Sequence, residues 1–106
     1  MKAVVAYVKP HMLADVTRAL RALDGLTGMS VIKVHGFGRG RIDVEDEPRE
    51  EHMKIEVFCR DDLMETLVTT IERAAHTGLR GDGKICVWDV SVAVRISTGE
   101  RGNAAV

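Results

Sequence analysis

The chain has few aromatic residues, two cysteines, two prolines and almost no net charge. Phe, Trp and Tyr make up 4% of its 106 residues, and the formal net charge is -1 at pH 7. This balance creates no overall field that would attract nucleic acid or an anionic membrane. No apolar run approaches the roughly 20 residues of a membrane span, and the first eight residues are too short for a secretory signal. We therefore expect a cytoplasmic protein that is not embedded in a membrane and does not bind nucleic acid.

The spacing of the cysteines and histidines is unlike that of metal ligands. Cys59 and Cys86 form no Cys-x-x-Cys motif and are expected to be buried and reduced. No two of the four histidines are four residues apart. We therefore expect no metal site built by one chain, and a metal-binding trimer using His52 and Cys59 is kept as an alternative.

At 106 residues the chain is expected to form a single domain, residues 1–106, with little room for a deep pocket of its own. A ligand-binding site between subunits is therefore favoured over a pocket within one chain. Apolar residues alternate between a period of two and a period near 3.6, which is typical of a sheet with packed helices. Strands are expected at residues 2–8, 29–36 and 53–59, followed by a last strand or bent pair over 85–87 and 90–96.

Two amphipathic helices are predicted between these strands. The first spans residues 11–24. The second begins after Asp62, whose side chain is expected to cap the first turn in a capping box with Glu65, and it continues to Gly78. The resulting order is βαββαβ, an α+β, ferredoxin-like arrangement with an antiparallel sheet and both helices on one face.

Three segments rich in glycine or cations predict a nucleotide site. Residues 77–84, TGLRGDGK, combine three glycines with two cations. Glycine lets the backbone bring its amides close to an anion, and Lys84 would add a point charge. Residues 36–39 (GFGR) and 95–101 (RISTGER) have similar ingredients. Alternatives remain: Lys84 facing solvent, Phe37 packed in the core, and Asp82 fixing the turn rather than touching a ligand.

Residues 40–52 are nearly all polar and lie between the second and third predicted strands. They bury too little apolar surface to order themselves, and a loop of this length is usually functional or disordered. We favour a flexible loop that contacts a partner, with a solvated hairpin tip as the alternative. Its acidic residues, which would suit a basic partner surface, are Asp43, Glu45, Asp46, Glu47, Glu50 and Glu51.

These motifs resemble those of the PII signal-transduction family. VKP at residues 8–10, GFGR at 36–39, TGLRGDGKI at 77–85 and RISTGERG at 95–102 follow the family order over nearly the whole chain. The resemblance implies a homotrimer that binds adenine nucleotides in clefts between subunits. It also implies a regulator without a catalytic site or covalent cofactor, whose long loop contacts a membrane transporter or a metabolic enzyme.

The resemblance also assigns site residues, position by position. Phosphates would be held by residues 81–84, the base would contact Ser30, and Arg95 would reach in from the adjacent chain. The full implied nucleotide set is Ser30, Gly36, Phe37, Gly38, Arg39, Glu56, Gly81, Asp82, Gly83, Lys84 and Arg95. A small anion is expected near Gly40, Arg41 and His52.

The sequence departs from family members that sense 2-oxoglutarate. Gly40 stands where they have a glutamine that helps coordinate magnesium, His52 where they have a lysine, and Ser97 where they have a second arginine. We therefore expect ADP or AMP to compete well with ATP, and 2-oxoglutarate to bind weakly. Tyr7 is the only tyrosine, which excludes modification of a loop tyrosine.

These departures favour a divergent branch of the family that is linked to inorganic carbon or carboxysomes. In this interpretation ADP, AMP or ATP, together with bicarbonate, would change the affinity of the 40–52 loop for its partner. The first alternative is a nitrogen regulator that senses ATP and 2-oxoglutarate and controls an ammonium transporter. A slow ATP hydrolase is the alternative from another class, weakened by the missing glutamine and arginine.

Overall fold

The computed structural model describes residues 1–37 and 50–106, so Gly38, Arg39, Gly40 and Arg41 lie outside the described residues. Short 3-10 helices occur at Pro10–Met12 and Gly102–Ala105. The longer elements follow the predicted βαββαβ order. They are β1 (Lys2–Val8), α1 (Leu13–Arg21), β2 (Ser30–Gly36), β3 (Glu50–Cys59), α2 (Asp61–Ala75) and β4 (Gly83–Asp89).

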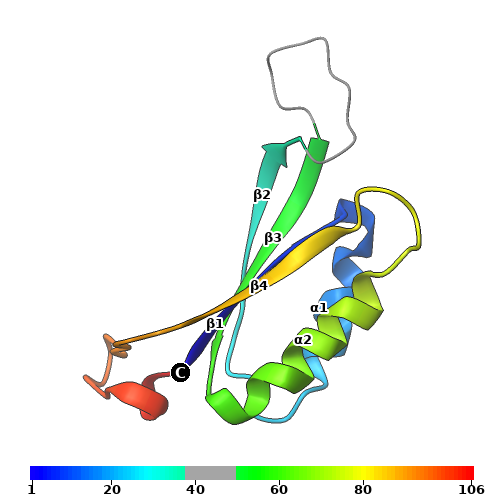
Figure 1. Ribbon diagram of the computed structural model, residues 1–106. Coiled ribbons are helices and arrows are strands. Elements are labelled where there is room, and N and C mark those ends of the chain that lie inside the picture. Colours follow the sequence, from blue (N-terminus) through cyan, green and yellow to red (C-terminus); the bar gives the residue numbers. More distant parts are fainter. Residues whose placement is uncertain (38–49) are drawn as a thin grey trace.

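The four strands form one antiparallel sheet in the order β2-β3-β1-β4. Both helices cover the same face of this sheet (Figure 1). The central strand β1 pairs on both sides, so Ala6 lies opposite Ile55 on β3 and opposite Ile85 on β4. The predicted α+β, ferredoxin-like arrangement is confirmed.

The hydrophobic core lies between the sheet and the two helices. Alternate residues of the central strands point toward the helices, as the period of two requires. Leu20 of α1 and Leu67 of α2 are fully buried against them. Truncating either leucine to alanine would leave a cavity, at a typical cost of about 2–5 kcal/mol. The sheet residues of this core are Val4, Ala6, Val8, Ile55, Val57 and Cys59.

The predicted helix boundaries need two corrections. The first helical segment opens as a 3-10 turn at Pro10–Met12, and its α-helix ends at Arg21 rather than at residue 24. The second helix begins at Asp61 and ends at Ala75 rather than at Gly78. Arg60 is its N-cap and no side chain caps it, so the predicted cap by Asp62 is wrong. Asp61 instead accepts a hydrogen bond of 2.7 Å from the N-terminal ammonium of Met1.

Other corrections concern the strands. The last strand is β4 alone. Beyond it, the Val90 amide donates to the Met1 carbonyl at 3.1 Å, and residues 90–96 pair with another segment in one isolated bridge, from Val94 to Arg101. Residues 50–52, assigned to the polar loop, belong to β3. Cys86 is exposed rather than buried, because it lies opposite Val5 on the face of the sheet that carries no helix.

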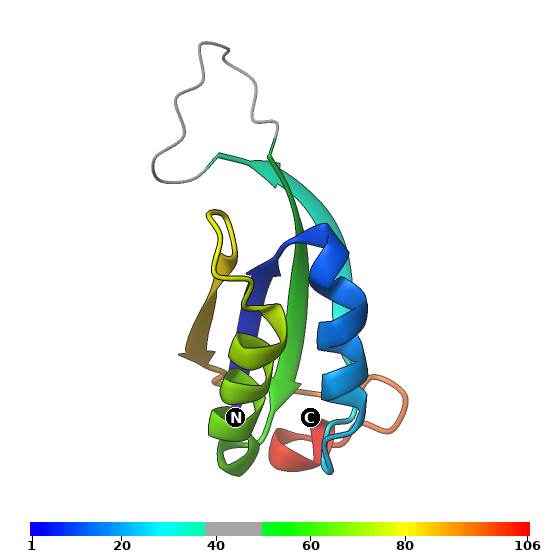
Figure 2. The ribbon, with the colours of Figure 1, turned by 90° about the vertical axis from the view of Figure 1, so that its right-hand side faces the viewer.

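The uncovered face of the sheet has an apolar surface. Phe58 and Trp88 lie on either side of Ala3 in the pairing register, so both occupy the face opposite the core. Their exposed fractions are 46% and 51%, and Ile32 on the same face is 54% exposed. Figure 2, which views the molecule from its helical side, shows α1 and α2 in front of the sheet. A large exposed apolar surface of this kind usually marks an association site.

Candidate functional site

Asp82 organises the glycine loop that joins α2 to β4. One carboxylate oxygen accepts hydrogen bonds from the amides of Thr77 (2.9 Å) and Gly78 (3.1 Å). The other accepts from the Thr77 hydroxyl and lies 3.1 Å from the Lys9 ammonium. These bonds, those from Thr77 above all, hold the pKa of Asp82 well below its usual range. The Asp82 carboxylate is thus bound by the loop itself. This favours the alternative in which Asp82 fixes the turn over the one in which it contacts a ligand.

Lys9 and Thr77 are loop-fixing residues that the sequence reasoning missed. The Lys9 ammonium donates to the Thr77 hydroxyl at 3.2 Å as well as pairing with Asp82. The two residues are far apart in the sequence, and only the pairing of β1 with β4 brings the end of β1 beside the loop. No local spacing could have revealed this contact. The VKP motif was the only available signal.

The backbone of the loop requires glycine at particular positions. Gly78, Gly81 and Gly83 all have positive φ, between 80° and 100°, which favours glycine. A Cβ on Gly83 would lie 1.6 Å from the carbonyl oxygen of Tyr7. Gly83 is therefore required by the close approach of β4 to β1, whatever else it contacts.

Two backbone donors of the loop remain available for a ligand. The amides of Thr77 and Gly78 are bound by Asp82, and the Leu79 amide donates to the Thr77 hydroxyl at 3.1 Å. The amides of Arg80 and Gly81, in contrast, donate to no group among residues 1–37 and 50–106. Successive unpaired amides in a tight turn form an anion-binding concavity.

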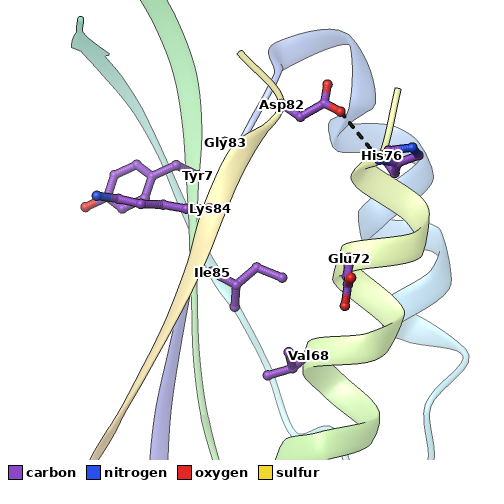
Figure 3. Close-up of a pocket in the computed structure, with 8 residues that line it drawn as sticks. All are labelled: Tyr7, Val68, Glu72, His76, Asp82, Gly83, Lys84 and Ile85. Atoms are coloured by element: carbon purple, nitrogen blue, oxygen red, sulfur yellow. Dashed lines mark ion pairs between the residues drawn. The ribbon is translucent and has the colours of Figure 1, made fainter. Parts of the chain in front are cut away.

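Lys84 is the first side chain after the loop that can reach an anion. It lies opposite Tyr7 in the register, and Figure 3 shows both side chains on the side of β4 away from α2. Within the described part of the chain, the Lys84 ammonium pairs with no carboxylate. A compact ammonium without a carboxylate partner is a suitable phosphate partner.

A pocket lies between α2 and the start of β4, and it is partly apolar and partly acidic. Its volume is about 370 Å³, and Val68 and Ile85 form its apolar part. Glu72 and Asp82 line it too, and His76 Nδ1 lies 3.7 Å from Asp82 Oδ2 (Figure 3). Two carboxylates at one opening would repel phosphate. Asp82, Gly83 and Lys84 of the predicted nucleotide set are among the residues that line this pocket, but its two carboxylates make the opening itself a poor phosphate site.

The structure brings Gly36 and Phe37 to the same end of the sheet as the glycine loop. Gly36 lies opposite Glu50, and the same end holds the pair of Val8 with Gly83. Phe37 is 73% exposed, so the alternative of core packing is wrong for this residue.

Three other predicted residues lie far from Lys84 within one chain. Ser30 and Glu56 face each other on β2 and β3, whereas Lys84 lies on β4 at the other edge of the sheet. Three strand spacings, about 14 Å, separate β2 from β4. Arg95 lies in the C-terminal segment, where its guanidinium donates to the Ala105 carbonyl at 3.2 Å. One chain therefore does not assemble the whole predicted set.

His52 makes a specific contact with the glycine loop. Its Nε2–H donates to the Gly81 carbonyl at 2.8 Å, and the same nitrogen lies 3.8 Å from Glu50 Oε1. The side chain expected to bind a small anion thus has a protein partner. Gly40 and Arg41, its predicted companions, lie outside the described residues.

The described residues bring together no group of three His, Cys, Asp or Glu side chains suited to a metal ion. His52 and Cys59 lie at opposite ends of β3 and point to opposite faces, so they cannot share an ion within one chain. No helix in the described part of the chain is long and apolar enough to cross a membrane.

Comparison with known proteins places the chain in a family. The sequence profile of the family described as Nitrogen regulatory protein P-II matches residues 1–100. Nitrogen regulatory protein P-II of Klebsiella oxytoca and Nitrogen regulatory protein P-II 1 of Escherichia coli K12 are each 45% identical to it over the full length of both chains. Nitrogen regulatory protein P-II of Azospirillum brasilense is 41% identical over the same extent. The chain belongs to the nitrogen regulatory P-II family of signalling proteins.

Proposed function

We propose that the protein is a non-enzymatic nitrogen regulator that binds an adenine nucleotide through residues 80–84. The observation that carries this proposal is the loop fixed by Asp82, which leaves the amides of Arg80 and Gly81 and the ammonium of Lys84 without partners among the described residues. Backbone donors and a lysine together form a phosphate site. The names of the similar proteins support nitrogen regulation better than the carbon-linked interpretation.

The complete site is proposed to form between copies of the chain in a homotrimer. Ser30 lies on β2, at the opposite edge of the sheet from Lys84, so a neighbouring copy would have to supply it, together with Arg95. Glu56, opposite Ser30 on the interior strand β3, would belong to the same half of the site. The uncovered apolar face with Phe58 and Trp88 provides a surface for this association.

A regulatory rather than hydrolytic role is supported by the state of the carboxylates. Hydrolysis of a nucleotide needs a positioned water and usually a metal-binding carboxylate. Asp82 is held by Thr77 and Lys9, and Glu56 lies 3.7 Å from the Lys54 ammonium. Asp82 is engaged by the loop, and Glu56 has a cation beside it that would compete with a metal ion, so both observations weaken the hydrolase alternative.

Carbon-linked sensing is a second candidate, and one contact favours it. His52 binds the Gly81 carbonyl at 2.8 Å, at the position where the resemblance implies a lysine for 2-oxoglutarate. An imidazole held in this way offers a dicarboxylate less than a free ammonium would. A smaller anion such as bicarbonate would need fewer contacts.

Isothermal titration calorimetry with ATP, ADP and AMP separates these candidates. Each nucleotide is titrated alone, with magnesium and 2-oxoglutarate, and with bicarbonate. Affinity for ATP that rises with 2-oxoglutarate supports the nitrogen regulator, and affinity for ADP or AMP that rises with bicarbonate supports the carbon-linked candidate. Absence of binding by all three nucleotides would refute the proposed function. Regulation of a transporter or enzyme would then be tested by co-purification with and without the bound nucleotide.

A further inference from the structure

His52 of β3 ties the glycine loop to the sheet. Its Nε2 lies 2.8 Å from the Gly81 carbonyl oxygen, and because a carbonyl can only accept a hydrogen bond, this nitrogen must carry the proton. The same nitrogen is 3.8 Å from Glu50 Oε1, which is beyond hydrogen-bond distance. The His52 side chain is 16% exposed, so it lies against the protein rather than extending into solvent. Within residues 1–37 and 50–106, the hydrogen bond of this nitrogen is therefore made to the Gly81 carbonyl.

The backbone at Gly81 needs a restraint to stay in one orientation. Gly81 has a φ of +81°, in the left-handed region, and a glycine rotates more freely than any other residue. A Cβ on Gly81 would lie 2.8 Å from Glu50 Oε1, so the Glu50 side chain would have to move to admit a larger residue. The hydrogen bond from His52 supplies the restraint that a side chain on Gly81 does not.

This hydrogen bond acts on the backbone that carries the unpaired donors. Asp82 holds the start of the loop through two backbone amides, and His52 holds the Gly81 carbonyl near its end. The amides of Arg80 and Gly81, which are proposed to bind phosphate, lie between these two fixed points. If the Gly81 carbonyl turned toward a bound phosphate, the two oxygens would repel each other. Donors that are ordered before a ligand arrives also reduce the entropy cost of binding.

We propose that His52 is a positioning residue of the phosphate site. Its hydrogen bond to the Gly81 carbonyl holds the amides of residues 80 and 81 in the orientation that binds an anion. The inference rests on the proposed function, because it assumes that phosphate binds at residues 80–84. In this role His52 acts through the backbone of the loop and need not touch the ligand.

Two substitutions of His52 separate its hydrogen bond from its bulk. His52→Leu keeps much of the volume but has no donor, whereas His52→Gln has an amide that can donate from nearly the same position. The matched control is His35→Leu. It removes an imidazole from the same end of the sheet but from the other face, where His35 Nε2 lies 3.2 Å from Glu51 Oε1. Dissociation constants of ATP, ADP and AMP are measured for the wild type and the three variants by calorimetry.

A second measurement reports on the hydrogen bond itself. The Gly81 carbonyl and the Asp82 amide belong to one planar peptide unit, so a hydrogen bond to the carbonyl polarises the amide. The nuclear magnetic resonance signal of the Asp82 amide nitrogen should therefore shift in His52→Leu and stay near its wild-type position in His52→Gln. General destabilisation of the fold would not produce this difference between the two variants.

We expect His52→Leu to weaken nucleotide binding by about fivefold to tenfold, in line with the net contribution of one hydrogen bond. His52→Gln and His35→Leu should bind within about twofold of the wild type. Four results would overturn the inference while the proposed function stands: wild-type affinity in His52→Leu, an equal loss in His52→Gln, the same loss in His35→Leu, or an unshifted Asp82 signal in His52→Leu. If the wild type binds none of the three nucleotides, the proposed function fails, and this inference fails with it.

Discussion

The Lys9 ammonium lies 3.1 Å from the Asp82 carboxylate, and this ion pair joins the end of β1 to the loop between α2 and β4. Asp82 also binds the amides of Thr77 and Gly78. One side chain therefore determines which backbone donors of the loop are used internally and which remain for a ligand. The nucleotide-binding proposal depends on this division.

Replacing Asp82 with alanine should weaken nucleotide binding without removing Lys84. The amides of Thr77 and Gly78 would lose their acceptor, and the turn that presents residues 80–84 would lose its fixed geometry. Loss of hydrogen bonds to a charged group suggests a decrease in affinity of roughly tenfold. Calorimetry with ADP measures this effect, and an unchanged affinity would show that the loop geometry does not depend on Asp82.

The low pKa of Asp82 predicts a specific loss of stability in acid. In the folded state the hydrogen bonds from Thr77 keep this carboxylate ionised at pH values where the unfolded chain takes up a proton. The unfolded state then binds more protons, so stability falls as the pH falls. The contribution of Asp82 is complete above the ordinary carboxyl pKa of about 4 and is lost progressively below it.

The measurement is the melting temperature as a function of pH for the wild type and Asp82→Asn. The wild type should be more stable near neutral pH, and the difference should shrink as the pH drops below about 4. A difference that is constant over this range would show that the ionised carboxylate contributes no pH-dependent stability.

Gly83→Ala should be strongly destabilising. The new Cβ would lie 1.6 Å from the Tyr7 carbonyl oxygen, and alanine is strained at the φ of +100° found there. A cost of about 3 kcal/mol or more is expected, because backbone on both strands must move. Gly28→Ala is the control, since a Cβ there meets nothing within 4 Å. Urea denaturation of both variants checks the prediction, and equal midpoints would contradict it.

Trp88→Glu should dissociate the proposed trimer. Trp88 is half exposed on the uncovered apolar face, so a buried charge in the assembly would be costly. Arg73→Glu, at an exposed position on α2, serves as the control. Sedimentation velocity gives the mass of each species. A trimeric Trp88→Glu variant would place the interface elsewhere, and a monomeric wild type would refute the assembly.

Local sequence patterns predicted the helices and the sheet because their apolar periods match the buried faces. The predicted cap of α2 failed because the helix begins at Asp61, so that Asp62 lies inside the first turn and not at the N-cap position. The predicted burial of Cys86 failed because β4 lies at the edge of the sheet and presents this residue to the uncovered face. Periodicity gives the spacing of side chains on a strand, but only the strand order determines what covers each face.

The glycine loop illustrates a similar limit for the site. Its glycines and Lys84 could be identified from the sequence, since their chemistry is local. The contacts of Lys9 with Asp82 and of Glu50 with Gly81 could not, because each joins residues from different elements. The strand predicted over 90–96 was also wrong. The Arg95 amide donates a hydrogen bond to the Glu100 carbonyl, within the C-terminal segment, and this part of the chain does not extend the sheet.

The most direct test of the account is ADP binding by Lys84→Ala, measured by isothermal titration calorimetry beside the wild type. Lys33→Ala, which removes an exposed lysine from the other face of the sheet, is the matched control. The account predicts that Lys84→Ala keeps the assembly state of the wild type but loses about a hundredfold or more in affinity, whereas Lys33→Ala binds normally. Wild-type affinity in Lys84→Ala would contradict the assignment of this loop as the phosphate site.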